Sequence, residues 1–232
     1  STLRLVYEPQ LDLRSGRIAG LEGLLRWHDA ELGEVSEART GEAADAAGVT
    51  RELTWWMFNN GMRPCADMAR AGLQVPLSLK ITAGGLVPPA FPDFMGRALR
   101  TWRVPPKMLV IEVHETALAG GLEQVKEALE RLKGHGLHLA IDGFGTGSSS
   151  LSNVAELPLD ELRLAAAFVT DMQHSPVHEK IVRSLVRLAR DLGLAVTAEG
   201  VEDGTTALAL TGLGCARIQG GSSTEGWKSA KL

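Results

Sequence analysis

The chain alternates between short apolar runs and longer amphipathic stretches along most of its length. Most of the runs are apolar at consecutive positions, as in the strands of a parallel sheet that helices cover. We predict eight strands from these runs, at residues 3–8, 16–25, 75–81, 108–113, 137–142, 160–164, 194–199 and 215–219.

Helical spacing is clearest in two stretches between the predicted strands. In residues 123–133 the shared apolar face consists of Val125, Leu129 and Leu132. In residues 177–192 it consists of Ile181, Leu185, Leu188 and Leu192. Gly134 and Gly193 follow these stretches, where a left-handed helix end is favoured. Eight strands separated mostly by helices predict an α/β fold, a (β/α)8 TIM-barrel-like single domain over residues 1–232.

Composition and charge limit the functional classes to which this protein can belong. Hydrophobic residues make up 44% and charged residues 22%, so the chain can bury a sizeable core. The net charge of −4 argues against a general nucleic-acid-binding surface. Cys65 and Cys215 form no CxxC pair, which favours a reducing compartment. The sequence has no apolar run of about 18 residues and no basic-then-apolar leader, so we expect a cytoplasmic domain without membrane contact.

Polar residues occur where the apolar runs stop. They are Glu22, Lys80, Glu112, Asp142, Arg163, Glu199 and Gln219. The carboxyl ends of barrel strands meet around one mouth, where chemistry is assembled. Any one of these residues could form a structural ion pair, but all of them at one edge indicate a functional mouth, present or ancestral. Carboxylates with an amide are typical ligands of Mg²⁺ or Mn²⁺, which favours metal-assisted phosphoester hydrolysis or a relic of it.

Several motifs, in order from residue 5 to about residue 220, carry a family resemblance. Glu22-Gly23-Leu24-Leu25-Arg26-Trp27 resembles E-A-L-L-R-W, and residues 112–116 resemble E-I-T-E-S. Residues 142–151 resemble D-D-F-G-T-G-Y-S-S-L, residues 198–202 match A-E-G-V-E, and Gln219-Gly220 matches Q-G. The chain is thus similar to the EAL domain family of cyclic di-GMP phosphodiesterases. The resemblance implies an EAL-type barrel, often with one reversed strand, and cyclic di-GMP as the ligand.

The chain departs from this family at positions that hold metal. The resemblance implies metal ligands at Glu22, Glu112, Asp142 and Glu199, together with an Asn, a second Asp and a water-positioning Lys. At the last three positions this chain has Lys80, Gly143 and Arg163. An ammonium group has no lone pair to give a cation, so Lys80 would act as an internal counter-ion. We therefore expect Mg²⁺ and Mn²⁺ binding to be lost, no cofactor, vestigial carboxylates and no enzymatic activity.

Binding of the nucleotide is a separate question. Positions that match ligand contacts of the family are Arg26, Asp45, Asp142, Arg163, Glu199, Glu202 and Gln219. Glu115 matches a residue that supports the glycine-rich loop at residues 143–150. Three departures weaken the match: Thr40-Gly41-Glu42 for F-I-P, Ala165 for an Asp, and a tail at residues 221–225 without the family's aromatic residues.

Three functions are compatible with these matches and departures. The first is a non-hydrolysing cyclic di-GMP receptor that regulates a protein partner or an adjacent signalling domain. The alternatives are a protein-interaction scaffold that binds no nucleotide, and a weakly active metal-dependent phosphodiesterase. The abrupt start at Leu3 indicates a domain excised from a longer signalling protein.

His114 and the tryptophan pair at residues 55–56 are further candidates for a functional role. His114 could be a ligand, but a position facing the surrounding helices is favoured. Trp55 and Trp56 lie at helical spacing beside Leu53, so at least half of this cluster is expected in the core. Either Trp would become a protein or homodimer contact if it were exposed.

Overall fold

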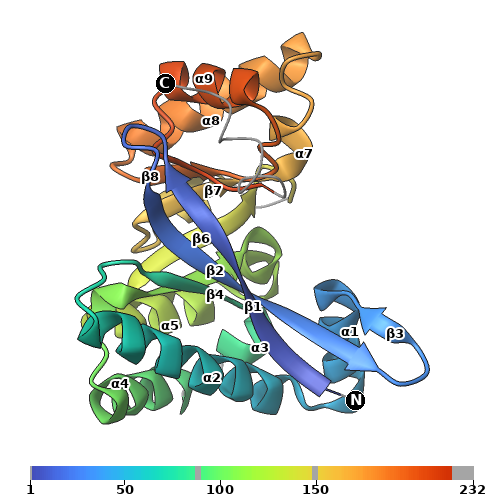
Figure 1. The fold of residues 1–232 in the computed structure, drawn as a ribbon, viewed down its shortest axis with the longest axis vertical. Coiled ribbons are helices and arrows are strands. Elements are labelled where there is room, and N and C mark those ends of the chain that lie inside the picture. The colour runs from blue at the N-terminus through green and yellow to red at the C-terminus, as the bar shows by residue number, and fades with distance from the viewer. Residues whose placement is uncertain (1, 87–89, 148–150, 221–232) are drawn as a thin grey trace.

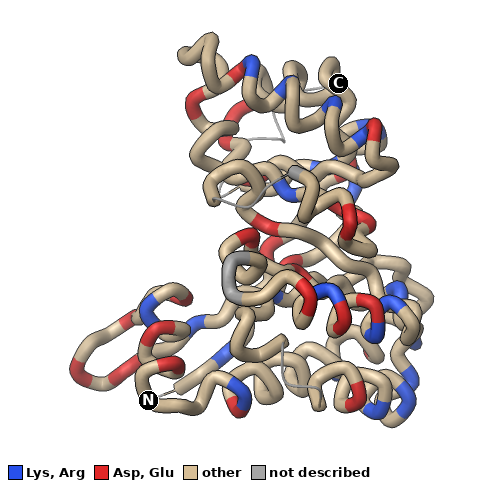
Figure 2. Tube along the Cα trace, turned by 180° about the vertical axis from the view of Figure 1, so that it is seen from behind, with Lys and Arg blue, Asp and Glu red and all other residues tan. Residues whose placement is uncertain are grey.

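The computed structural model describes residues 2–86, 90–147 and 151–220. The end of the glycine-rich loop, residues 148–150, and the tail at residues 221–225 lie outside these ranges. Within the described ranges, no helix has the length and apolar character needed to cross a bilayer. Acidic and basic residues are interleaved along most of the trace, and the segment from Asp29 to Asp45 is richest in acidic residues (Figure 2).

The strands close into a barrel, which confirms the predicted fold class. Strands from β2 through β4 to β9 run parallel in chain order. Strand β1 pairs antiparallel with both β2 and β9 and so closes the ring with one reversed strand (Figure 1). The barrel strands are β1 (Thr2–Asp12), β2 (Ile18–Asp29), β4 (Leu77–Ile81), β5 (Leu109–His114), β6 (His138–Phe144), β7 (Glu161–Leu164), β8 (Ala195–Ala198) and β9 (Arg217–Ile218).

Helices cover the outside of the barrel. In Figure 1, α2, α4 and α5 lie against one end of the molecule and α7, α8 and α9 against the other. The helices are α1 (Glu37–Ala47), α2 (Thr50–Arg70), α3 (Ala83–Leu86), α4 (Ala90–Trp102), α5 (Leu122–Gly134), α6 (Leu151–Ala155), α7 (Ala166–Val169), α8 (Pro176–Asp191) and α9 (Gly204–Leu213). The 3-10 turns are η1 (Pro106–Met108) and η2 (Glu115–Gly120).

The core lies between the strands and this helical layer. Leu79, Ile111 and Leu139 are fully buried on adjacent strands. Burying a side chain of this size stabilises the fold by about 1.5–3 kcal/mol. On α5 the predicted apolar face is buried. On α8 the fully buried residues are Val182, Val186 and Ala189. Leu185 and Leu188 of the predicted face are half-buried against the core, and Leu192, which follows the helix, is exposed.

Several predicted boundaries are wrong. Strand β2 continues to Asp29, beyond the predicted end at residue 25, because its outer half pairs with β1 and with the unpredicted strand β3 (Gly33–Val35). Three residues are too few to give a recognisable alternation. Gly134 lies inside α5, and the left-handed residue after that helix is Gly136. Gly193 takes the left-handed conformation at the position predicted for it.

The two tryptophans of α2 are half-buried. The Trp55 ring stacks on Phe94, with ring centroids 4.9 Å apart. Trp56 lines an apolar cavity of about 540 Å³ together with Leu3 and Trp27. Trp55 therefore packs against α4, whereas Trp56 keeps part of its ring at the wall of this cavity.

Gly220 is required where the chain passes the segment after β8. A Cβ at this position would lie 1.9 Å from the carbonyl oxygen of Val201, and backbone atoms there cannot move aside cheaply. We expect Gly220→Ala to lower the free energy of unfolding by about 2 kcal/mol in a urea titration. Gly212→Ala, on the exposed face of α9 with no described atom within 4 Å, should instead raise it by about 0.5 kcal/mol. Equal effects of the two substitutions would contradict this account.

Candidate ligand-binding site at the barrel mouth

The register of the parallel strands brings the predicted polar residues together. Lys80 on β4 is paired with Glu112 on β5, and His114 is paired with Asp142 on β6. Glu22 on β2 is paired with Ser78 on β4. Side chains two positions apart on a strand share a face, so each pair contributes to one inner surface.

Lys80 lies between two carboxylates. Its Nζ is 3.0 Å from Glu22 Oε1 and 3.3 Å from Asp142 Oδ2. Burial lowers the pKa of Lys80, but the charges of Glu22, Asp142, Glu199 and Glu112 outweigh that effect and raise it above its usual value. The ammonium group therefore stays charged, and these distances support a counter-ion role for Lys80.

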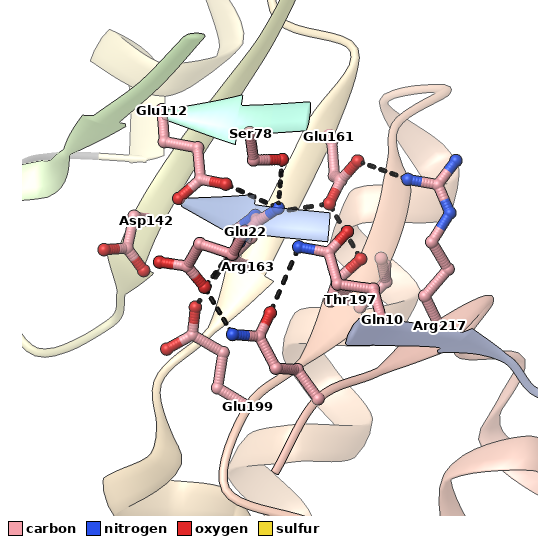
Figure 3. Close-up of polar contacts among 12 residues, drawn as sticks. Gln10, Glu22, Ser78, Glu112, Asp142, Glu161, Arg163, Thr197, Glu199 and Arg217 are labelled. Carbon is pink, nitrogen blue, oxygen red and sulfur yellow. Dashed lines mark hydrogen bonds and ion pairs between the residues drawn. The ribbon is translucent and has the colours of Figure 1, made fainter. Parts of the chain in front are cut away.

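Arg163 forms a second positive centre among Glu22, Glu112 and Glu161 (Figure 3). Its side chain is fully buried, and its Nη2 lies 2.6 Å from Glu112 Oε1 and 2.9 Å from Ser78 Oγ. Weaker contacts join it to Glu161 at 3.4 Å and to Glu22 at 3.5 Å. The sequence predicts a ligand contact for Arg163, but the guanidinium group is instead enclosed by the carboxylates and holds them in place.

Further polar groups extend this network into the barrel. Glu161, which sequence reasoning missed, accepts a hydrogen bond from Thr197 at 2.7 Å and one from Arg217 at 2.9 Å. Gln219 donates to Glu8 at 2.8 Å and also to Glu22. Gln219 is buried as well, so it braces Glu22 from below.

The resemblance implies two divalent cations at this mouth, and the residues present do not fit them. Lys80 occupies the space between Glu22 and Asp142 with donors only. Gly143 has no side chain to supply an oxygen. Among the described residues, no group of three His, Cys, Asp or Glu is placed to hold a metal ion.

A cavity of about 690 Å³ opens above these ion pairs. Its polar lining includes Glu37, Asp45, Lys80, His114 and Asp142. Glu37 was missed because an acidic residue after the N-cap Ser36 is typical of a helix start. Burial raises the pKa of Glu37, while the charges of Lys80 and Arg26 oppose the rise.

The other predicted ligand contacts lie at different depths. Asp45 is exposed on α1 at the cavity wall and accepts a hydrogen bond from Thr50. Arg26 is half-buried outside the lining, and its Nη1 donates to the Leu25 carbonyl at 3.2 Å. Glu202 is exposed after β8 and is not among the lining residues.

Glu115 braces the start of the glycine-rich loop. Its Oε2 accepts hydrogen bonds from the backbone of Gly145 at 2.9 Å and of Gly147 at 3.0 Å. A Cβ at Gly147 would lie 2.8 Å from the Glu115 carboxyl carbon, so glycine allows this close approach. The loop is thereby fixed beside the mouth up to residue 147.

His114 does not face the helical layer, contrary to the sequence-based expectation. It lies two positions after Glu112 on the same strand and therefore shares its face. Its side chain is exposed and lines the cavity together with Lys80 and Asp142.

Two carboxyl groups of the mouth hold protons more tightly than usual. Burial is the main cause of the raised pKa of Glu112, and Arg163 opposes it. Burial, with the charge of Asp142, raises the pKa of Glu199 to about 8. At neutral pH, therefore, Glu199 is mainly protonated and adds little negative charge to the mouth.

This shift predicts a pH dependence of stability. Between the usual Glu pKa of 4.5 and the folded value of about 8, the folded protein keeps a proton on Glu199 that the unfolded chain releases. The free energy of unfolding should therefore fall as the pH rises through this window. In urea titrations from pH 5 to 8.5, Glu199→Gln should reduce the fall by a few kcal/mol, on the order of that shift. The exposed Glu123→Gln should leave the slope unchanged, and an unchanged slope in both variants would contradict the shift.

Comparisons with known proteins show which family the chain resembles over most of its length. The model of the EAL domain matches residues 1–222. The chain is 31% identical over 216 residues to the Cyclic di-GMP phosphodiesterase PA2567 of Pseudomonas aeruginosa, covering 93% of this chain and 37% of that protein. It is 30% identical to the Cyclic di-GMP phosphodiesterase RocR of the same species, covering 92% of this chain and 55% of that protein. The chain spans about a third of the length of the first curated relatives that it matches.

Solved structures agree with the barrel. The PaMucR phosphodiesterase in complex with c-di-GMP superposes with a TM-score of 0.88 at 29% identity, over 94% of this chain and 89% of that one. The EAL domain of Mycobacterium smegmatis DcpA superposes with a TM-score of 0.78 at 28% identity, over 93% and 87% of the two chains.

These relatives correct one expectation. The prediction that the chain is not an enzyme is contradicted, because relatives that match nearly the whole chain are phosphodiesterases by name. The replacements at Lys80, Gly143 and Arg163 therefore do not establish a loss of activity. With the family model matched from residue 1 to residue 222, the chain belongs to the EAL domain family.

Proposed function

We propose that this domain binds cyclic di-GMP in the cavity at the barrel mouth and takes part in cyclic di-GMP signalling. The observation that carries the proposal is the cavity of about 690 Å³ into which Lys80 projects, at the end of the barrel where ligands of this architecture bind. This volume lies within the range of small-molecule sites, about 300–1,000 Å³. The similarity to a phosphodiesterase solved with c-di-GMP supports the same ligand.

The charges of the mouth are compatible with an anionic ligand. Burial raises the pKa of Glu199 to about 8, so this group is mainly protonated at neutral pH. Lys80 and Arg163 offset part of the negative charge of the neighbouring carboxylates and so reduce the repulsion of a phosphodiester. Because Lys80 is partly exposed, it supplies the cation nearest to the cavity.

We further propose a receptor role, in which the bound nucleotide acts on an attached signalling domain or a protein partner. The relatives support this part of the proposal because they are about three times as long as the chain. Signalling proteins commonly couple a ligand-binding domain to a second domain in this way.

Titration calorimetry with cyclic di-GMP tests binding, with and without Mn²⁺. The wild-type protein is expected to bind, and Lys80→Met should weaken binding about tenfold because a charge-assisted hydrogen bond is lost. Lys126→Met is the matched control, since Lys126 pairs with Glu156 outside the cavity lining. Absence of heat with the nucleotide at tens of micromolar would remove the proposal.

The same relatives favour a second candidate, hydrolysis of a phosphodiester bond at this mouth. It rests on their names and on the presence of Glu22, Glu112, Asp142 and Glu199 at positions that match the family's motifs. Formation of the linear dinucleotide in proportion to protein, and its loss in Glu22→Gln, would establish this activity. Binding of cyclic di-GMP without formation of the linear dinucleotide would support the binding proposal and exclude hydrolysis.

A further inference from the structure

His114 and Gly143 meet in space. Both depart from the motifs given above, at a Thr position and at the second Asp position. A Cβ placed on Gly143 would lie 2.7 Å from His114 Nε2 and 3.2 Å from its Cδ2. The imidazole ring therefore fills the space that a side chain at position 143 would need.

Thr116 fixes the orientation of this ring. Its backbone N–H donates to His114 Nδ1 at 3.3 Å, and its Oγ1 lies 2.8 Å from the same nitrogen. Because Nδ1 accepts, the neutral ring carries its proton on Nε2. Within the part of the chain that the structure describes, Nε2 has no hydrogen-bond partner.

The ring that carries this donor lies at the wall of the cavity. His114 lines the cavity together with Lys80 and Asp142, and its side chain is exposed there. A carboxylate at position 143 would offer only acceptors and would repel a phosphodiester unless a cation lay between them. The imidazole offers a donor in the same place, which complements a phosphodiester oxygen directly.

We propose that His114 is a ligand-contacting residue of this chain, whose Nε2–H donates a hydrogen bond to a non-bridging phosphodiester oxygen of cyclic di-GMP beside Lys80. The inference rests on the proposed binding of that nucleotide at the mouth. Because Gly143 leaves room for the imidazole ring, a side chain of the protein itself can hold the phosphodiester.

The test is a calorimetric titration with cyclic di-GMP of the wild-type protein and three variants. His114→Ala should raise the Kd about tenfold, because one hydrogen bond to a charged group is lost. His114→Gln, which keeps a side-chain N–H, should restore most of the affinity. His138→Ala is the matched control, because His138 begins β6 at the opposite end of the barrel and does not line the cavity.

A spectroscopic readout separates contact from folding. The imidazole C2–H resonance assigned to His114 by its loss in His114→Ala should shift when the wild-type protein is saturated with nucleotide. Wild-type affinity in His114→Ala, or an unmoved resonance on saturation, would overturn the role of His114 while leaving the proposed function intact. A wild-type protein that does not bind the nucleotide would overturn both.

Discussion

Replacement of Arg163 by methionine is expected to lower the free energy of unfolding by about 3–5 kcal/mol, because it leaves buried carboxylates without their cation. The guanidinium contacts Glu112 at 2.6 Å and Glu161 at 3.4 Å, and all three side chains are fully buried. Urea denaturation of the purified variant measures the loss. The loss should be smaller at pH 5 than at pH 8, because carboxyl groups deprived of Arg163 can take up protons.

Arg183→Met is the matched control. Arg183 pairs with Glu179 one turn away on α8, and both side chains are exposed. Such a pair contributes about 0.5 kcal/mol or less, so this variant should unfold almost as the wild-type protein does. If the two methionine variants were equally stable, Arg163 would not be the electrostatic centre of the barrel.

Divalent-ion binding is expected to be tightest when three positions change together. Lys80→Asn removes the ammonium group and supplies an amide oxygen, and Gly143→Asp supplies a carboxylate. With His114 retained, however, the new Cβ at position 143 would lie 2.7 Å from its Nε2. The triple variant that also carries His114→Thr should therefore bind Mn²⁺ at least about tenfold more tightly than the double variant, as one added carboxylate ligand implies.

Calorimetric titration with Mn²⁺ measures this difference in the absence of nucleotide. Lys126→Asn serves as the control, because it removes a lysine from a surface ion pair and should create no site. Equal affinity of the double and triple variants would show that His114 does not hinder a side chain at position 143. The left-handed backbone at Gly143, with φ of 68°, is tolerated by Asp better than by most residues.

The barrel could be predicted from the sequence because its strands are short and nearly continuous apolar runs. The ring of mouth residues could be predicted for the same reason, since Lys80, Glu112 and Asp142 interrupt those runs near their ends. The reversed direction of β1 could not be derived from the pattern, because alternation of side chains is identical in parallel and antiparallel strands. The family resemblance implied a barrel that often has one reversed strand, without saying which strand it is.

Depth inside the barrel could not be predicted either. Arg163 and Lys80 both occupy penultimate positions in short strands, yet one is fully buried and the other reaches the cavity. The stagger between neighbouring strands decides this, and no single strand encodes it. The contact between His114 and Gly143 likewise depends on the pairing of β5 with β6.

Strand β1 also sets the order in which the fold can be completed. Its pairing with β2 is local, so this hairpin can form early, whereas its other edge must wait for β9, at the far end of the described chain. A nascent chain that has not yet emerged to Ile218 presents the inner edge of β1, at Leu11 and Asp12, without its partner. Unpaired strand edges of this kind promote association between chains. During synthesis, this domain should therefore be prone to aggregate until β9 has emerged and paired with β1.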